Sequence, residues 1–275
     1  MGTLKIVGAL GAVVLGLGLA FTASAQEQSS ETTEELAKKA QNPVADLISL
    51  PFQSNTNFGV GPFHATQEIL NIQPVIPVSI SQDWNLITRW ITPVISQPKL
   101  SPIGHEQFGI GDLNPSLFLS PAKPGEIIWG VGPTFLLPTA TDQNLGNHRW
   151  GAGPSVVLLT IQGHWLFGVL ANNIWSFAST GEGSNVNQFL MQPFLNYNFP
   201  EGWYLTSSPV ITANWLADGR KWTVPVGGGI GRLFKIDKQP INMQVQAFYN
   251  VATPRGGAKW QARFQVQFLF PKGTP

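Results

Sequence analysis

The stretch WQARFQVQFLF, residues 260–270, alternates with a period of two residues. Apolar side chains stand at the even positions, and the odd positions between them carry Gln261, Arg263, Gln265 and Gln267. Successive side chains of a β-strand face opposite sides of the sheet, so this strand has one apolar and one amide-rich face. A soluble sandwich buries its apolar face. A transmembrane barrel turns that face toward lipid and lines its lumen with the polar one.

The first 25 residues have the pattern of a secretory signal peptide. Lys5 precedes an apolar run over residues 6–20, and Ala23-Ser24-Ala25 supplies the small residues of a cleavage site. An uncleaved membrane anchor is the alternative. No later stretch approaches the roughly 18 consecutive apolar residues of a helical span. The predicted organisation is a signal peptide at 1–25, a periplasmic segment at 26–46 and a barrel at 47–275.

Composition agrees with an exported membrane protein. Only 11% of the residues are charged, and there are 10 Trp and 17 Phe, against roughly 25% charged residues in an average soluble domain. Without Lys5 of the signal peptide, 15 basic residues face 15 acidic ones. This balance argues against a nucleic-acid partner. The absence of Cys excludes disulfides and thiolate metal sites.

The alternation predicts twelve strands, each long enough to cross a membrane, where about 9–11 tilted residues suffice. Tight turns and longer polar loops alternate between them, and Trp recurs at the strand ends, as in the aromatic girdles of bacterial barrels. The predicted fold class is all-β: a single antiparallel barrel in the cell outer membrane with both chain ends in the periplasm. The predicted strands are 48–60, 67–80, 84–97, 108–120, 126–139, 149–161, 164–177, 187–199, 202–215, 221–234, 239–252 and 258–270.

Thr32 and Glu35 fit a capping box, which predicts a short helix over residues 34–41. Asn42-Pro43 then ends the helix. The segment is either a periplasmic tether or a plug that enters the barrel, and the sequence leaves both open.

Most charged residues in the middle of the predicted strands stand at positions whose side chains point toward the lumen. These are Arg89, Asp112 and Arg263, and we expect them to set a weak ion preference. Asp112 is expected to pair with Arg89 or Arg263, with a cation site beside Asn114 as the alternative. Arg232 falls on the outer parity, which predicts a bulge in the run 227–231 or a position near the inner interface. The predicted lumen-lining residues are Arg89, Asp112, Asn114, Gln192, Tyr204, Gln244, Gln246, Arg263 and Gln265.

Proline inside predicted strands argues against a regular barrel, because each one removes a donor from the hydrogen-bonded ladder. We expect local bulges or wide pairs at these positions. They are Pro74, Pro93, Pro115, Pro133, Pro154, Pro193, Pro209 and Pro225.

Several motifs resemble those of a bacterial outer-membrane transporter family that is often mislabelled "neuromedin U". They are AKKAQNPVADLISLPFQ at 37–53, LNIQPVIP at 70–77, GDLNPS at 111–116, WGVGPTFLLPTATD at 129–142 and WYLTSSPVITANW at 203–215. The chain is also similar to the broader outer-membrane family of the meta-pathway of phenol degradation. The resemblance implies a barrel and a transport role, without a defined substrate or site residues.

An amide-rich inner face predicts a passive channel for small, mostly uncharged or aromatic solutes. The alternatives are an outer-membrane lipid hydrolase, which needs a Ser–His pair on the outer wall that the sequence does not reveal, and a closed structural barrel. No catalytic, cofactor or metal residues are predicted. The expected partners are outer-membrane lipid, an unidentified small solute and the barrel-assembly machinery during biogenesis. The four histidines lie in predicted loops or at the turn where a predicted strand begins, and they are His64, His105, His148 and His164.

Overall fold

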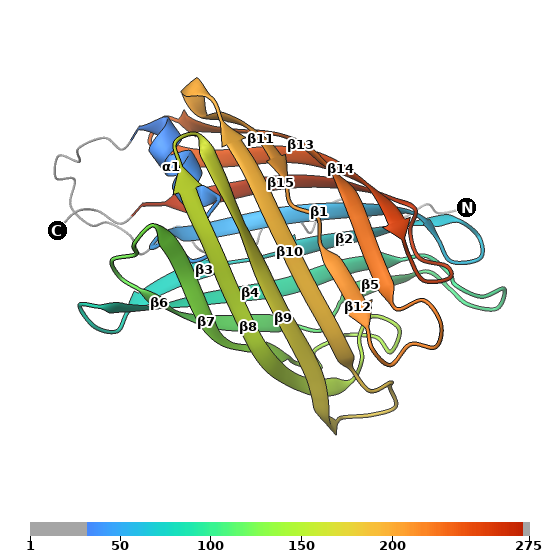
Figure 1. The fold of residues 1–275 in the computed structure, drawn as a ribbon. Coiled ribbons are helices and arrows are strands. Elements are labelled where there is room, and N and C mark those ends of the chain that lie inside the picture. Colours follow the sequence, from blue (N-terminus) through green and yellow to red (C-terminus); the bar gives the residue numbers. More distant parts are fainter. Residues whose placement is uncertain (1–31, 272–275) are drawn as a thin grey trace, which may run out of the picture. The chain divides into compact units, whose positions relative to one another are not determined.

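The computed structural model describes residues 32–271 (Figure 1). The predicted signal peptide, the start of the predicted periplasmic segment and the last four residues lie outside this range. The helices are α1 (Thr33–Ala40) and the 3-10 helix η1 (Pro200–Gly202). The strand segments are β1 (Ile48–Val60), β2 (Ala65–Ile72), β3 (Val75–Ser79), β4 (Trp84–Gln97), β5 (Gln107–Ile110), β6 (Asn114–Pro121), β7 (Ile127–Leu136), β8 (Arg149–Gln162), β9 (Trp165–Ser179), β10 (Asn187–Asn198), β11 (Trp203–Ser207), β12 (Ile211–Asn214), β13 (Trp222–Ile236), β14 (Gln239–Ala252) and β15 (Trp260–Phe270).

The strands close into one antiparallel barrel, which confirms the predicted fold class. Three spanning strands are each interrupted once, so the 15 segments make 12 spanning strands. The interrupted strands are β2–β3, β5–β6 and β11–β12. Closure comes from β15, which pairs with β1 from Ile48↔Phe270 to Phe58↔Trp260. A closed barrel leaves no sheet edge whose backbone groups would be unsatisfied in lipid.

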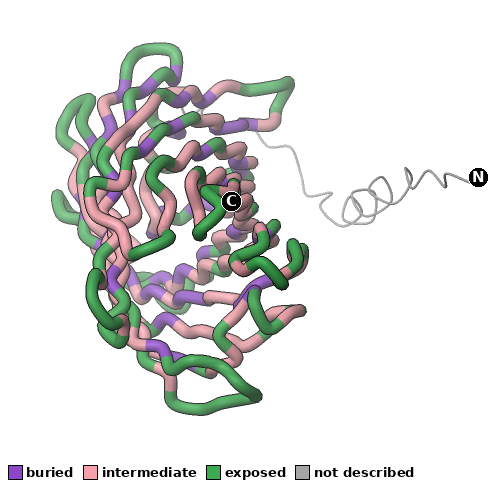
Figure 2. Tube along the Cα trace, turned by 90° about the vertical axis from the view of Figure 1, so that its right-hand side faces the viewer, coloured by how far each residue is buried: buried purple, intermediate pink, exposed green. Residues whose placement is uncertain are grey.

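The outer face of the barrel is apolar and ends in aromatic residues. Large apolar side chains along the strands, such as Phe264 and Leu205, are about half exposed at 46% and 51%. At one end Trp165 contacts Tyr197, with ring centroids 4.7 Å apart, and at the other Trp215 contacts Trp222 at 5.4 Å. Figure 2 shows exposed positions along the strands and in the loops. Apolar outside and polar inside is the reverse of a soluble protein and fits a bilayer.

Of the two alternatives predicted for Arg232, the bulge in the run 227–231 is wrong. The register between β13 and β14 is continuous through the glycine run 227–231, and the only shift along this pair falls between Val224 and Pro225. Arg232 lies opposite Trp203 in the sheet, with its guanidinium carbon 4.9 Å from the Trp203 ring centroid. A cation on an aromatic ring near the end of a strand is stabilised at the membrane interface without a bulge.

Some of the prolines explain where the strands break. Pro74 lies in the gap between β2 and β3, and Pro209 in the gap between β11 and β12. Pro225 follows the register shift in β13, as expected for a bulge. Pro133 and Pro154 instead lie directly opposite each other in the ladder between β7 and β8.

The predicted helix forms, and its capping box is present: Glu35 N–H donates to Thr32 Oγ1, and Thr32 N–H donates to Glu35 Oε2. It lies at the end of the barrel that carries the tight turns, where Glu34 approaches His164 of the β8–β9 turn (Figure 1). No helix among residues 32–271 is long and apolar enough to cross a membrane.

Residues 36–47 pack inside the tight-turn end. Leu36, Ala37, Ala45 and Leu47 form one buried cluster with Leu233 and Leu269 of the wall. Val44 joins a second, formed with inward side chains of β4, β6, β8, β9 and β10, which are Ile87, Phe118, Val157, Leu159, Leu166, Leu170 and Phe194. We call these two clusters the basal core. The described part of the segment therefore packs against the inner wall and is not a free tether. We call residues 36–47 the plug.

Candidate functional site

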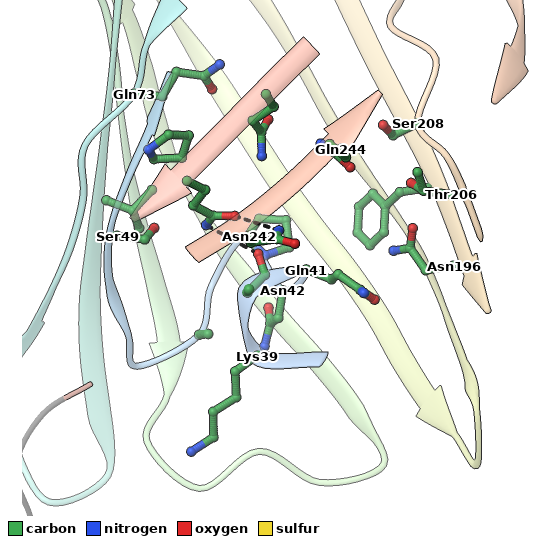
Figure 3. Close-up of a pocket in the computed structure, with 18 of the residues that line it drawn as sticks. Lys39, Gln41, Asn42, Ser49, Gln73, Asn196, Thr206, Ser208, Asn242 and Gln244 are labelled. Atoms are coloured by element: carbon green, nitrogen blue, oxygen red, sulfur yellow. Dashed lines mark hydrogen bonds between the residues drawn. The ribbon is translucent and has the colours of Figure 1, made fainter. Parts of the chain in front are cut away.

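A polar cavity of about 140 Å³ lies directly above the plug. Figure 3 shows Ser49 and Gln73 on one side of it and Asn196, Thr206 and Ser208 on the other. We call it the central cavity. It is lined by Lys39, Ala40, Gln41, Asn42, Pro43, Ala45, Leu47, Ser49, Pro51, Gln53, Gln73, Val75, Arg89, Gln192, Phe194, Asn196, Tyr204, Thr206, Ser208, Asn242, Gln244, Gln265 and Gln267.

Its amide lining follows from the strand period. Inward side chains are two residues apart along each strand, and the register aligns them in rows across β14, β15 and β1. Gln244, Gln265 and Gln53 form one such row. The next row away from the plug holds Gln246, Arg263 and Asn55. The sequence pattern of β15 thus becomes a ladder of amides with one guanidinium.

Arg89 faces the central cavity from β4. Its Nη2 donates to Oε1 of Gln73 at 2.6 Å, beside the break between β2 and β3. This is the one hydrogen bond that Arg89 makes within the described residues. A guanidinium carries five N–H donors, so four have no hydrogen-bond partner within the described residues.

Arg263 closes the cavity on the side away from the plug. It is 2% exposed and donates from Nε to Asn55 Oδ1 at 3.1 Å and from Nη1 to the Ser208 carbonyl at 2.7 Å. Gln246 accepts from the Ser208 N–H at 3.1 Å. These bonds satisfy backbone groups that the Pro209 break takes out of the ladder, which the membrane interior requires. We call Arg263, Asn55, Ser208 and Gln246 the arginine partition.

Two further hollows lie beyond the partition. An upper cavity of about 230 Å³ is lined by the next inward residues, including Asn57, Val210 and Gln261. It shares Thr253 and Gly257 with an outer vestibule of about 1160 Å³ between the loops after β1, β12 and β14. The three hollows follow one side of the barrel from the long loops to the plug.

Asp112 corrects the expected pairing with an arginine. It lies in the break between β5 and β6, is 8% exposed, and accepts from Asn147 N–H at 2.6 Å and Ala140 N–H at 3.3 Å. It therefore holds the 140–148 loop rather than an arginine. Asn114 beside it bonds to Thr134 Oγ1 at 3.2 Å and to the Phe135 carbonyl.

Tyr204 forms part of the cavity wall near the plug. Its hydroxyl donates to Asn242 Oδ1 at 2.7 Å, and Asn242 Nδ2 donates to Gln267 Oε1 at 3.1 Å. Gln267 in turn donates to the carbonyl of Ala40 at 3.4 Å. A Cβ at Gly231 would lie 2.2 Å from the Tyr204 ring, so the glycine gives this ring its space.

Five of the predicted lumen residues come together around the central cavity: Arg89, Gln192, Tyr204, Gln244 and Gln265. Gln246 and Arg263 lie in the partition, and Asp112 and Asn114 lie near the 140–148 loop. Whether these residues line a conducting lumen stays a prediction. The sequence reasoning missed Lys39, Gln41 and Asn42 of the plug, although the apolar positions Leu36, Val44 and Leu47 around them could have indicated a buried segment.

The histidines show no metal site. Within residues 32–271 no group of three or more His, Cys, Asp or Glu side chains could hold a metal ion. His64 and His148 have positive φ angles of 50° and 53°, which places them in tight loop conformations.

A closed β-barrel with a lipid-compatible outer face and a polar interior is an outer-membrane barrel. No family model and no curated protein matches the chain. Solved outer-membrane structures are similar to the chain in fold. An outer membrane channel from Pseudomonas putida F1 has a TM-score of 0.61 at 16% identity, covering 82% of this chain and 94% of that one.

The NanC porin has a TM-score of 0.48 at 12% identity over 81% and 100% of the two chains. Outer membrane phospholipase A from Escherichia coli has 0.45 at 14% identity over 88% and 99%. At these identities only the fold is shared, so the resemblance to the transporter family stays a prediction.

Proposed function

We propose that the chain is an outer-membrane channel that passes small, mostly uncharged or aromatic solutes passively. The observation that carries this is the series of three hollows along one side of the barrel. Amide side chains there offer donors and acceptors to a solute as it leaves water. The long-loop end is taken as the outer surface and the tight-turn end as the periplasmic one.

The plug and the arginine partition are the two closures of this route. The plug fills the periplasmic end with apolar side chains, whereas the partition is a set of hydrogen bonds. Solute passage requires release of the plug. Gln41, which exchanges hydrogen bonds with Asn198 at 2.8 and 3.3 Å, forms part of its attachment.

Conductance in a planar bilayer tests the proposal. We expect small channels from the mature protein and a larger conductance from a variant lacking residues 26–46, with both forms showing heat-modifiable migration as folded barrels do. Two folded proteins without conductance would indicate a closed structural barrel. Release of fatty acid from phospholipid vesicles would instead indicate the hydrolase alternative.

A further inference from the structure

We infer that the central cavity binds the carboxylate of a small monoanionic solute, with Arg89 as the cation that holds it. The inference rests on the proposed channel function and concerns its aromatic solutes. It gives the aromatic solute a carboxylate, so the preferred solute is a monoanion rather than an uncharged molecule. It follows from the charge, hydrogen bonding and size of the cavity.

Charge is the first argument. Arg89 lines the central cavity, and no acidic residue lines it. Lys39 is also in the lining, but its side chain extends away from the other labelled side chains in Figure 3 and has a partner of its own, so its charge is not assigned to the cavity. The partition adds Arg263, whose described acceptors are neutral oxygens of Asn55, Ser208 and Gln261. Asp112, an acidic side chain of the barrel interior, is engaged by the 140–148 loop. The cavity therefore has a net positive charge that an anion would balance.

Hydrogen bonding is the second argument. Arg89 uses one donor on Gln73 and retains four. A planar guanidinium matches a carboxylate with two parallel N–H···O bonds, which are stronger than neutral ones. The amides of Gln192, Gln244 and Gln265 line the same cavity and can donate to the remaining carboxylate lone pairs.

Size and wall chemistry limit the rest of the solute. The cavity volume of about 140 Å³ is close to that of an engineered cavity that takes benzene, about 150 Å³. Phe194 and Tyr204 supply aromatic surface, and Val75 and Leu47 supply aliphatic surface. One ring bearing one carboxylate fits these limits.

The outer vestibule has the same sign of charge. Arg220, Arg255 and Lys259 line it, and Asp218 is the acidic residue there. A cleft with one dominant sign of charge concentrates ligands of the opposite sign. The vestibule and the arginine partition therefore both favour monoanions, and the upper cavity between them is lined by uncharged residues.

Equilibrium dialysis of radiolabelled benzoate against the full-length, detergent-folded protein tests the inference, with benzamide as the uncharged isostere. At low ionic strength we expect saturable binding of one benzoate, at least about tenfold tighter than benzamide, since bonds to charged groups are worth about 1.5–3 kcal/mol. Chloride should compete. Arg89→Gln should weaken benzoate binding about tenfold or more, and Arg89→Lys should weaken it less.

Arg232→Gln is the matched control, because it removes a guanidinium from a strand on the outer face. Equal binding of benzoate and benzamide by the wild-type protein would overturn the inference without any variant. Wild-type benzoate affinity in a folded Arg89→Gln variant would overturn it too. A protein that conducts but does not bind benzoate loses this inference and keeps the channel function. If benzoate binds but neither the mature nor the plug-deleted form conducts, the channel function is lost and the carboxylate site is kept.

Discussion

The basal core and the adjacent layer that holds the central cavity are enclosed by the same barrel and differ in how they are filled. In the basal core, Leu36 and Val44 meet apolar wall residues, and the interior is solid. The next three inward positions along β15 after Leu269 are Gln267, Gln265 and Arg263, so the wall there carries amides and a guanidinium, and the interior is hollow. Apolar side chains pack without directional demands, whereas amides hold one another at hydrogen-bond distances and leave space. The plug is thus a closure made by packing, and the arginine partition is a closure made by hydrogen bonds.

The largest expected effect comes from removing the wall that both layers share. Deletion of residues 264–275 takes away the part of β15 that pairs with Ile48–Ser54 of β1 and with β14. Each backbone group left open in lipid costs several kcal/mol. We expect no membrane insertion, measured as loss of heat-modifiable migration and of protease resistance.

Deletion of residues 272–275 is the control, and we expect it to fold as the mature protein does. A protease-resistant barrel formed by the longer deletion would contradict the closure between β1 and β15.

Leu36→Ala tests the closure made by packing. Leu36 is 1% exposed in the basal core, and a buried Leu→Ala change costs about 2–5 kcal/mol. We expect this cost to weaken the docking of the plug and to leave the stability of the barrel unchanged. Conductance should then rise, and residues 32–47 should become sensitive to protease.

Leu205→Ala makes the same truncation on the outer face, where the side chain is 51% exposed. It should leave the plug docked. An equal rise in conductance in both variants would mean that plug docking does not control the channel.

Arg263→Gln tests the closure made by hydrogen bonds. It removes donors to the Ser208 carbonyl and to Asn55, and orphaned polar groups cost about 1–3 kcal/mol each. We expect a loss of about 2–3 kcal/mol in barrel stability, measured by urea unfolding in vesicles. The reversal potential in a salt gradient should also move toward cations.

Arg232→Gln again serves as the control, since it removes the same charge outside the barrel. A folded Arg263→Gln channel with wild-type selectivity would show that the partition does not face the permeating ions.

The sequence predicts the features that follow from the two-residue alternation of side chains. It does not predict the features that depend on contacts between residues far apart in the chain. The strand count and the inward face of β15 follow from a two-residue alternation, which is local. The partner of Asp112 lies 35 residues away in the 140–148 loop, and the Pro209 break is stabilised by Arg263 from another strand. Neither contact has a local signal. The capping box predicts α1, but the apolar wall that receives the plug is assembled from seven strands, which are β4, β6, β8, β9, β10, β13 and β15.

The smallest expected effect concerns the attachment of α1 at its exposed end. A hydrogen bond from Lys38 Nζ to Glu34 Oε1, 2.9 Å long, lowers the pKa of the Glu34 carboxyl below its usual value, with a smaller contribution from nearby His164. Because the folded-state pKa is depressed, this contribution to helix stability is present above the pKa of the unfolded state. It is lost as pH falls through the lower folded value.

A pair of this spacing on a helix is worth about 0.3–0.5 kcal/mol. Glu34→Gln should therefore lower hydrogen-exchange protection of the α1 amides by roughly twofold at neutral pH, and the difference from the wild type should vanish once acid protonates Glu34. Protection that is equal in both proteins at neutral pH would show that the basal core alone holds the helix. In that case docking of the plug depends on packing at both ends of α1, and the contrast between the two layers becomes sharper.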